Sequence, residues 1–353
     1  MNLPLLMTIL ITTAVAQVSR ACIIPQGSDR VAAVIAFELC EQAQNTVFPN
    51  YRMSDYPFVL VDLEKSPNSI TVIQKGKILG SFTVQSPLKI QNRLYEYQIP
   101  SDIHFDNNPE LNPLLKSIGV AEAMIWNIGM DFPLTGSPWA GTAMETWPKI
   151  WIHLGLMTHE AFHLFGQHLQ KISLAWPESY LGISDEAREG MQNICFNRDA
   201  NTKSLVALER QAILDSFIAV KQKNLKFGIK KAKEFISTRK ARYALLAGTQ
   251  IPDPVLLPRS CEQVENAASV AEGIPEFIGN GTLLNLGIIS AEQALLYFPD
   301  RDTGIYYRFS LFQALVFTSA TDISIADVLQ KPENGIEAVL ERWIQLQDSN
   351  ARN

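Results

Sequence analysis

The segment 159–163, which reads H-E-A-F-H, is the feature that most constrains this chain. It lies in the apolar-periodic stretch 154–169, a pattern that predicts a helix. Residues four apart share one helix face, so His159 and His163 could grip a single metal ion. Zinc lowers the pKa of a bound water to about 7, and Glu160 would stand close enough to take its proton. The motif therefore indicates a zinc hydrolase, most often a metallopeptidase.

The alternative is an ordinary amphipathic core helix whose histidines are satisfied by hydrogen bonds. The chain has 5 histidines in 353 residues, and four of them fall between residues 153 and 168. The stretch around Phe162 is largely apolar, and an unpaired Glu160 buried there would be costly. We therefore favour the zinc interpretation.

A zinc site needs a third protein ligand, for which the sequence offers three candidates. His168 almost completes the extension H-x-x-G-x-x-H but comes one residue early. Glu186 or Glu189 follows a short distance downstream, where the alternative is the charged first turn of a helix. Glu272 lies late on a predicted helix that begins near Cys261.

Glu272 is the preferred third ligand because a carboxylate in an apolar neighbourhood needs a cation. Glu276, four residues later, shares its face if the helix continues past Gly273 and Pro275. It could then hold a ligand histidine in the correct tautomer. The alternative is a helix that this glycine and proline simply stop.

These residues resemble the gluzincin branch of zinc metallopeptidases, in clan MA. H-E-A-F-H at 159–163 and E-G-I-P-E-F at 272–277 resemble its H-E-x-x-H and E-G-x-x-E-[YF] motifs. The resemblance implies a zincin-like domain that cleaves peptide or protein substrates, and it covers roughly residues 115–320. It implies zinc ligands His159, His163 and Glu272, with Glu160 as general base and Glu276 supporting a ligand histidine.

Many relatives stabilise the oxyanion with a tyrosine in Y-x-x-G. Here Tyr307 is followed by serine at the glycine position, and Tyr306 stands beside it. Either could be the oxyanion donor. This departure keeps open a second function, in which a zinc-stabilised binding or scaffolding protein retains the fold without catalysis.

The strand and helix patterns along the chain predict an α+β protein with a small N-terminal β-rich part and a mainly helical C-terminal part. The chain is 47% hydrophobic and 19% charged, which is typical of a packed globular protein. Its formal net charge of −6 gives no general support for a nucleic-acid partner. We expect an N-terminal helix and β-rich module over residues 17–114 and the zincin-like domain over 115–345, with a helical insertion at about 175–255. Oligomeric state cannot be inferred from the sequence.

The first residues resemble an export signal. An apolar run over residues 3–16 ends in Ala14-Val15-Ala16, which fits a signal peptide of residues 1–16, although no Lys or Arg precedes it. The run is too short for an ordinary membrane span, so no integral membrane segment is expected. An apolar first helix of the fold is the alternative. We expect an exported protein, periplasmic or secreted.

Four cysteines suit export and allow three pairings. We expect Cys22 to pair with Cys40 and Cys195 with Cys261, and free buried thiols are the alternative for a cytosolic protein.

Local patterns predict the remaining elements. A helix is expected over residues 28–43, and helices over 200–220 and 230–246. Strands are expected at 58–61, 70–73, 78–84, 95–99 and 121–126, with a hairpin turn at 75–77 and a linker at 109–113. By analogy with the resembled family, residues 121–130 would be the edge strand that pairs with substrate. Residues 221–242 carry nine basic side chains against one acidic, which we interpret as a solvated helix face with Phe235 and Ile236 turned inward. The alternative is a site for anionic lipid or another polyanion.

Overall fold

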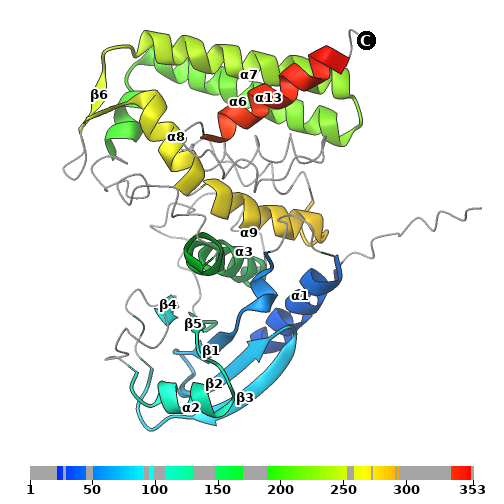
Figure 1. Ribbon diagram of the computed structural model, residues 1–353, viewed down its shortest axis with the longest axis vertical. Helices are drawn as coiled ribbons and strands as arrows, with labels where there is room; N and C mark the ends of the chain where they lie inside the picture. Colours follow the sequence, from blue (N-terminus) through cyan, green and yellow to red (C-terminus); the bar gives the residue numbers. More distant parts are fainter. Residues whose placement is uncertain are drawn as a thin grey trace, which may run out of the picture.

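The computed structural model of this chain describes residues 22–26, 29–44, 51–88, 90, 95–98, 108–129, 148–169, 189–252, 258–271, 273–290, 293 and 335–350. Within these residues the protein is mixed α+β, with a small N-terminal sheet and a helical C-terminal part, as expected. Figure 1 shows three levels: the sheet with α1 and α2, then α3 and α9, then α6, α7, α8 and α13. The zinc motif belongs to the middle level.

The sheet has five described strands in the order β3-β2-β1-β5-β4. The β1–β5 pair is parallel, whereas the β1–β2, β2–β3 and β4–β5 pairs are antiparallel. The strands expected from the sequence are all present. Their bounds are β1 Phe58–Asp62, β2 Ser66–Gln74, β3 Lys77–Thr83, β4 Tyr95–Gln98 and β5 Ala123–Asn127.

The turn between β2 and β3 is the tight hairpin expected at residues 75–77. Lys75 and Gly76 have φ angles of 55° and 68°, and Gln74 pairs with Lys77. Two consecutive residues at positive φ give the turn whose twist matches that of the flanking strands.

Two expectations about this region were wrong. The expected edge strand at residues 121–130 is internal, because β5 lies between β1 and β4. All five of its residues are buried, which is typical of a strand covered on both faces. The expected linker at 109–113 is helix α2, Leu111–Ser117, since a proline at position 113 is tolerated in a first helical turn. Because β5 joins the same sheet as β1, the boundary expected at residue 114 falls within one sheet.

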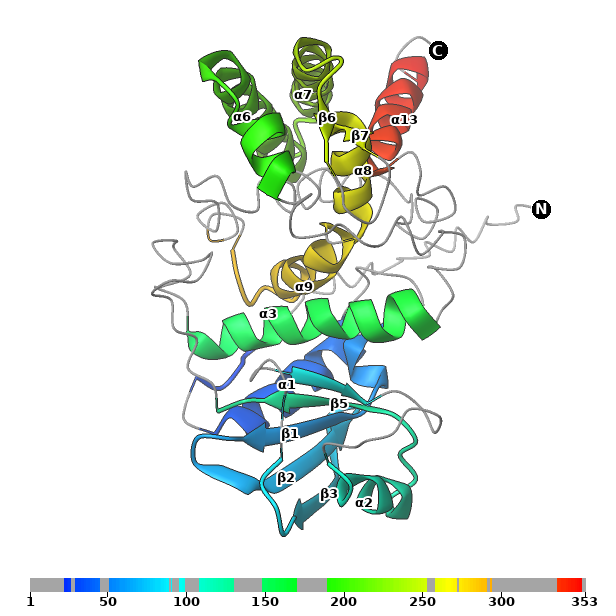
Figure 2. The same cartoon turned by 90° about the vertical axis from the view of Figure 1, so that its left-hand side faces the viewer.

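Both faces of the sheet are covered by apolar side chains. Phe58 and Trp126 face the main core, which also contains residues of α1 and α3. Val59 and Ile125, their neighbours in sequence, face a smaller core with residues of α2. This alternation follows from the two-residue period of a strand. Figure 2 shows α3 lying along the sheet on the side of α1, so the sheet supports the helix with the zinc motif.

The upper level is built from long helices. The α6 and α7 helices form an antiparallel hairpin, and α13 packs against α7 and α8. Within the described ranges, no helix is both long and apolar enough to cross a membrane. The α-helices of the described residues are α1 Arg30–Gln44, α2 Leu111–Ser117, α3 Lys149–Ala161, α6 Ala200–Lys221, α7 Leu225–Leu245, α8 Cys261–Ala271, α9 Gly273–Asn285 and α13 Gly335–Asn350.

Two disulfides join the four cysteines in the pairing expected from the sequence. Cys22 is bonded to Cys40 and Cys195 to Cys261, with Cα–Cα distances of 6.0 and 5.6 Å. The second bridge links the π-helical turn Met191–Phe196, which precedes α6, to the first residue of α8. It therefore fixes the base of the α6–α7 hairpin to the helix that leads into α9.

A buried ionic cluster holds the upper helices together. The guanidinium of Arg242 on α7 donates to both carboxylate oxygens of Glu209 on α6 and of Glu265 on α8, at 2.6–3.0 Å. Arg239, also on α7, pairs with Glu265 at 3.1 Å and with Glu337 on α13 at 2.8 Å. A buried charge without a partner is costly, so these pairs constrain how the four helices pack.

Helix α1 places two buried carboxylates against backbone amides of the 3-10 turn Met53–Asp55, which precedes β1, and of the β2–β3 turn. Glu41 accepts from the amides of Met53 and Ser54 at 2.9 and 2.7 Å, and Glu38 accepts from the amide of Gly76 at 2.6 Å. Burial raises the pKa of Glu38 to about 8, against the lowering effect of the Gly76 bond, and nearby Glu41 raises it further. Glu38 is therefore mostly protonated in the folded protein at neutral pH.

The raised pKa of Glu38 predicts a loss of stability with rising pH. The folded state holds this proton more tightly than the unfolded state does. The contribution of Glu38 to the free energy of unfolding is therefore complete below its pKa in the unfolded state, and it is lost as the pH rises towards about 8. Between pH 5.5 and 8.5 we expect the free energy of unfolding of the unmodified protein to fall on the order of a few kcal/mol. Glu38→Gln, which mimics the protonated form, should remove this fall. Urea unfolding of the unmodified protein and of the variant at the two pH values measures the effect, and an equal change in both proteins would contradict the prediction.

Candidate functional site

The two histidines of the motif lie side by side near the end of α3. The Nε2 atoms of His159 and His163 are 3.1 Å apart, and their ring centroids are 4.9 Å apart. His159 is buried and His163 is half-buried. The expected juxtaposition of the two imidazoles on one helix face is confirmed.

A π-helical segment, Phe162–Leu169, continues α3 and contains His163. Such wider turns occur often at functional sites. Aromatic contacts anchor it: Phe162 meets Tyr51 edge-on at 5.0 Å, and Phe165 stacks on Tyr56 at 4.2 Å. These contacts lie on either side of His163 in sequence and fix the segment that presents its ring.

A carboxylate from a distant helix holds the first histidine. Glu276 Oε2 lies 3.2 Å from His159 Nδ1, and both side chains are less than a tenth exposed. The other carboxylate oxygen accepts a hydrogen bond from the side-chain amide of Asn280. A proton on Nδ1 directed at Glu276 leaves the Nε2 lone pair of His159 facing His163. The contact is within ion-pair distance but does not have hydrogen-bond geometry. A hydrogen bond made there would fix the tautomer that a metal ligand requires.

The contact between Glu276 and His159 depends on a close crossing of α3 and α9. A Cβ on Gly279 would lie 2.6 Å from the carbonyl oxygen of Gly155 and 3.3 Å from His159 Cβ. Only a glycine allows the two backbones to approach so closely. Neither glycine nor Asn280 was predicted from the sequence. The sequence features that could have indicated them are a glycine within each of two apolar helices and the position of Asn280, four residues after Glu276.

Helix α9 begins at Gly273 and contains Pro275, so helical structure is present directly after the end of α8. Only residue 272 separates α8, which ends at Ala271, from α9. That residue, Glu272, lies outside the described part of the chain, as do Glu186, Tyr306 and Tyr307 and the side chain of His168.

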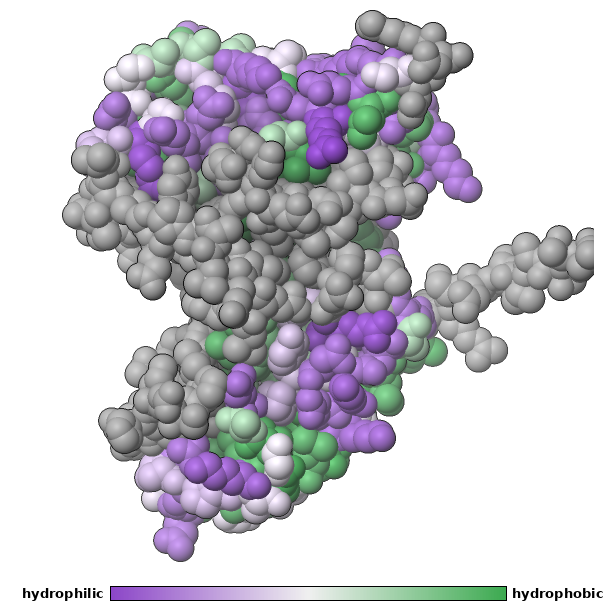
Figure 3. Space-filling model, in the orientation of Figure 1, coloured by the Kyte–Doolittle hydropathy of each residue, from purple (hydrophilic) through white to green (hydrophobic). Residues whose placement is uncertain are grey.

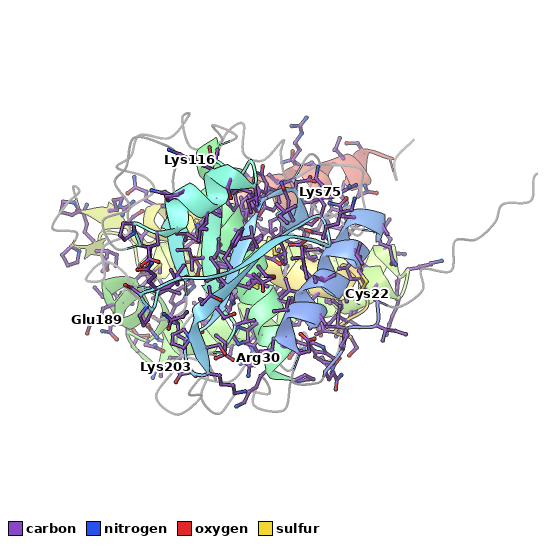
Figure 4. The ribbon with its side chains drawn as sticks, turned by 90° about the horizontal axis from the view of Figure 1, so that it is seen from below. Cys22, Arg30, Lys75, Lys116, Glu189 and Lys203 are labelled. Carbon is purple, nitrogen blue, oxygen red and sulfur yellow. A yellow bond between two sulfur atoms is a disulfide. The ribbon has the colours of Figure 1, made fainter. Side chains whose placement is uncertain are left out.

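The remaining predicted residues are placed as follows. Glu160 is half-buried on α3, directly after His159. Glu189 is exposed, and Figure 4 shows it at the periphery of the molecule. Among the residues with described positions, no group of three His, Cys, Asp or Glu side chains could hold a metal ion. The structure therefore does not bring Glu189 to the histidine pair.

His153, an earlier histidine on α3, has a different environment. Its Nδ1 accepts from the indole nitrogen of Trp126 on β5 at 3.1 Å, and its Nε2 lies 3.3 Å from the Arg30 guanidinium on α1. The side chain is fully buried. His153 thus connects α3 to the sheet and to α1, and it does not belong to the pair.

The histidine pair has the geometry of two ligands of one zinc ion. Two nitrogens bound at about 2.0–2.1 Å with tetrahedral angles lie roughly 3.3 Å apart. The Nε2 atoms here are 3.1 Å apart, and one ring is oriented by a carboxylate. Imidazole nitrogens with such a carboxylate partner suit zinc. The described residues therefore fit two of the protein ligands of a zinc site.

Comparisons of this chain with protein-family models, with curated proteins and with solved structures found no match.

The helix crossing yields a test of how the site is held. We expect Gly279→Ala to push α9 away from α3, because its Cβ would meet a backbone oxygen at 2.6 Å, and to destabilise the protein by about 1–3 kcal/mol. Gly155→Ala is the matched control, since its Cβ would meet only the end of the Leu283 side chain, at 3.2 Å. Urea unfolding compares the two variants. Equal losses would argue against a backbone contact.

Proposed function

We propose that this protein is a zinc-dependent peptidase with a zincin-like catalytic centre. The observation that carries the proposal is the placement of Glu276 on His159 Nδ1 at 3.2 Å, with His159 and His163 3.1 Å apart. These residues come from α3 and α9. A zinc site in which a carboxylate orients a ligand histidine requires such a meeting of side chains.

We propose Glu272 as the third protein ligand. It precedes Glu276 by four residues, a spacing that places two side chains on one face of a helix. Helices occupy both sides of position 272, ending at Ala271 and beginning at Gly273. The spacing therefore supports placing the Glu272 carboxylate one helical turn before Glu276, on the side of α9 that contacts α3.

The chain's own residues would then divide the chemistry of peptide hydrolysis. Zinc, when bound, supplies a Lewis acid that polarises the peptide carbonyl and acidifies a nearby water. Glu160 takes the proton of the attacking water and passes it to the leaving amine. Tyr307 or Tyr306 would donate a hydrogen bond to the oxyanion. Glu276 keeps His159 in the ligand tautomer throughout.

The sheet offers a place for an extended peptide. Strand β4 pairs with β5 on one side, and among the described strands nothing pairs with its other side. An edge strand presents free backbone groups to which a peptide can add as a further strand. We therefore assign substrate pairing to β4, Tyr95–Gln98, in place of the internal β5.

We infer that the protein is exported. All four cysteines are bonded in two disulfides, and such bonds persist in oxidising compartments. The apolar run that ends at residue 16 is consistent with a secretory leader.

The assigned roles predict different outcomes at three glutamates. Glu160→Gln should keep stoichiometric zinc and lower the rate of peptide hydrolysis by about 10²–10⁴-fold. Glu272→Ala should lose the metal, while Glu189→Ala, at an exposed position, should keep both zinc and activity. Metal content and a peptide-library digest with and without chelator measure these effects. Stoichiometric zinc without cleavage in the unmodified protein would instead favour a zinc-stabilised scaffold.

The orienting role proposed for Glu276 predicts a loss of zinc affinity when this side chain is changed. Glu276→Gln should weaken zinc binding by about 10–100-fold, because the amide no longer fixes the His159 tautomer as a carboxylate does. Competition with a zinc chelator measures the Kd. Glu262→Gln is the matched control on an exposed face of α8. Unchanged affinity in both variants would remove Glu276 from the site.

A further inference from the structure

The nine basic residues over positions 221–242 divide into two groups. Five are paired with acidic side chains, so their charges are used within the protein. Lys231 lies 3.2 Å from Asp215 and 3.0 Å from Glu234. The other paired residues are Lys233 with Asp348, Lys240 with Glu341, Arg239 with Glu265 and Glu337, and Arg242 with Glu209 and Glu265.

The other four, Lys221, Lys223, Lys226 and Lys230, gather at the turn between α6 and α7. None of them has an acidic partner within the structure as described, and residues 216–230 contain no Asp or Glu. We call residues 221–230 the hairpin tip. It lies at the end of the hairpin opposite the short strand β6, Gln250–Ile251 (Figure 1), where Figure 3 shows a largely hydrophilic surface. The tip is thus locally basic in a protein of net charge −6.

Two large apolar side chains are exposed among these lysines. Leu225 and Phe227 are 37% and 42% exposed, at the beginning of α7. Every residue from 221 to 227 is exposed. The tip therefore presents an apolar pair surrounded by unpaired ammonium groups, which differs from the solvated polar face expected from the sequence.

The backbone of the tip is well fixed. Ser216 donates its hydroxyl to the carbonyl of Gly228 at 2.8 Å, and the Asn224 side chain accepts from the amide of Phe227 at 3.3 Å. A Cβ on Gly228 would lie 2.7 Å from a methyl group of Val220, so α6 and α7 are closely packed here. The exposed groups are held in place before any partner arrives, which lowers the entropy cost of binding.

We propose that the hairpin tip docks this protein on an anionic phospholipid bilayer. The unpaired lysines would be attracted to the negative surface, each adding to the affinity, and Leu225 and Phe227 would enter the interfacial region. A nucleic acid would use the lysines but would leave the aliphatic Leu225 without a favourable contact. The apolar pair thus favours a lipid surface over another polyanion. This inference does not depend on the zinc site.

Lys221 is the least suitable of the four lysines for a test of charge. Partial burial lowers the pKa of the Lys221 ammonium, which lies 5.8 Å from the centre of the Phe217 ring. The test variant therefore changes Lys223, Lys226 and Lys230.

Vesicle sedimentation with the full chain tests the proposal. We expect binding to vesicles of phosphatidylglycerol and phosphatidylcholine, none to phosphatidylcholine alone, and a fall with added salt. K223Q/K226Q/K230Q should reduce the partition coefficient by about 100-fold. The matched control, K65Q/K77Q/K116Q, also removes three exposed lysines and changes net charge from −6 to −9 (−6 − 3), yet should bind as the unmodified protein does. Figure 4 shows one of these, Lys116, on α2.

A second variant tests the apolar part. L225S/F227S should keep its circular dichroism spectrum and should lose the binding that persists in high salt. Equal losses in the two lysine variants would overturn the proposal, since net charge alone would then explain binding. Failure of the unmodified protein to bind anionic vesicles would overturn it too. So would displacement from vesicles by duplex DNA at equal charge concentration, which would indicate a general polyanion site.

Discussion

The close crossing of α3 and α9 is the constraint on which the candidate site depends. His159 and Glu276 are far apart in the chain, and they meet because Gly279 lets the backbone of α9 approach the carbonyl oxygen of Gly155 on α3. A larger residue at position 279 would push the two helices apart and draw the carboxylate away from the imidazole. Helix α3 in turn rests on the sheet and on α1, through the buried His153 and its contact with Trp126. The geometry of the site is therefore set by backbone packing, and the reactive side chains follow from it.

The upper helices determine where α9 begins. Helix α8 is anchored to the α6–α7 hairpin by the carboxylate of Glu265, which the Arg242 guanidinium grips at 2.6 and 2.8 Å, and by the Cys195–Cys261 disulfide. One residue then separates α8 from the helix that carries Glu276. The helices between α3 and α9 thus have a structural use. They hold the beginning of α9, and with it Glu276, in a fixed position.

The sequence allowed prediction where short-range rules decide the structure. The alternating strands, the hairpin at Gly76 and the helix carrying His159 and His163 all follow from local periodicity, and both disulfide pairs are as expected. The predictions that were wrong concern contacts between segments far apart in the sequence. The internal position of β5 depends on a parallel pairing with β1 across sixty residues of chain, which a local pattern does not encode. The role of Gly279 likewise depends on which helix it meets. Glu272 remains a prediction, because it lies outside the described residues. The basic residues of 221–242 are evident from the sequence. Which of them pair with acidic side chains depends on the fold and could not be predicted.

The bridge between Cys195 and Cys261 closes a covalent ring around the α6–α7 hairpin, since the two cysteines are separated by 66 positions. The exposed turn at the end of this hairpin is accessible to a protease. A single cut there would leave the two chain fragments linked by the disulfide, with Arg242 still between Glu209 and Glu265. The protein would then persist as two chains joined by one covalent bond.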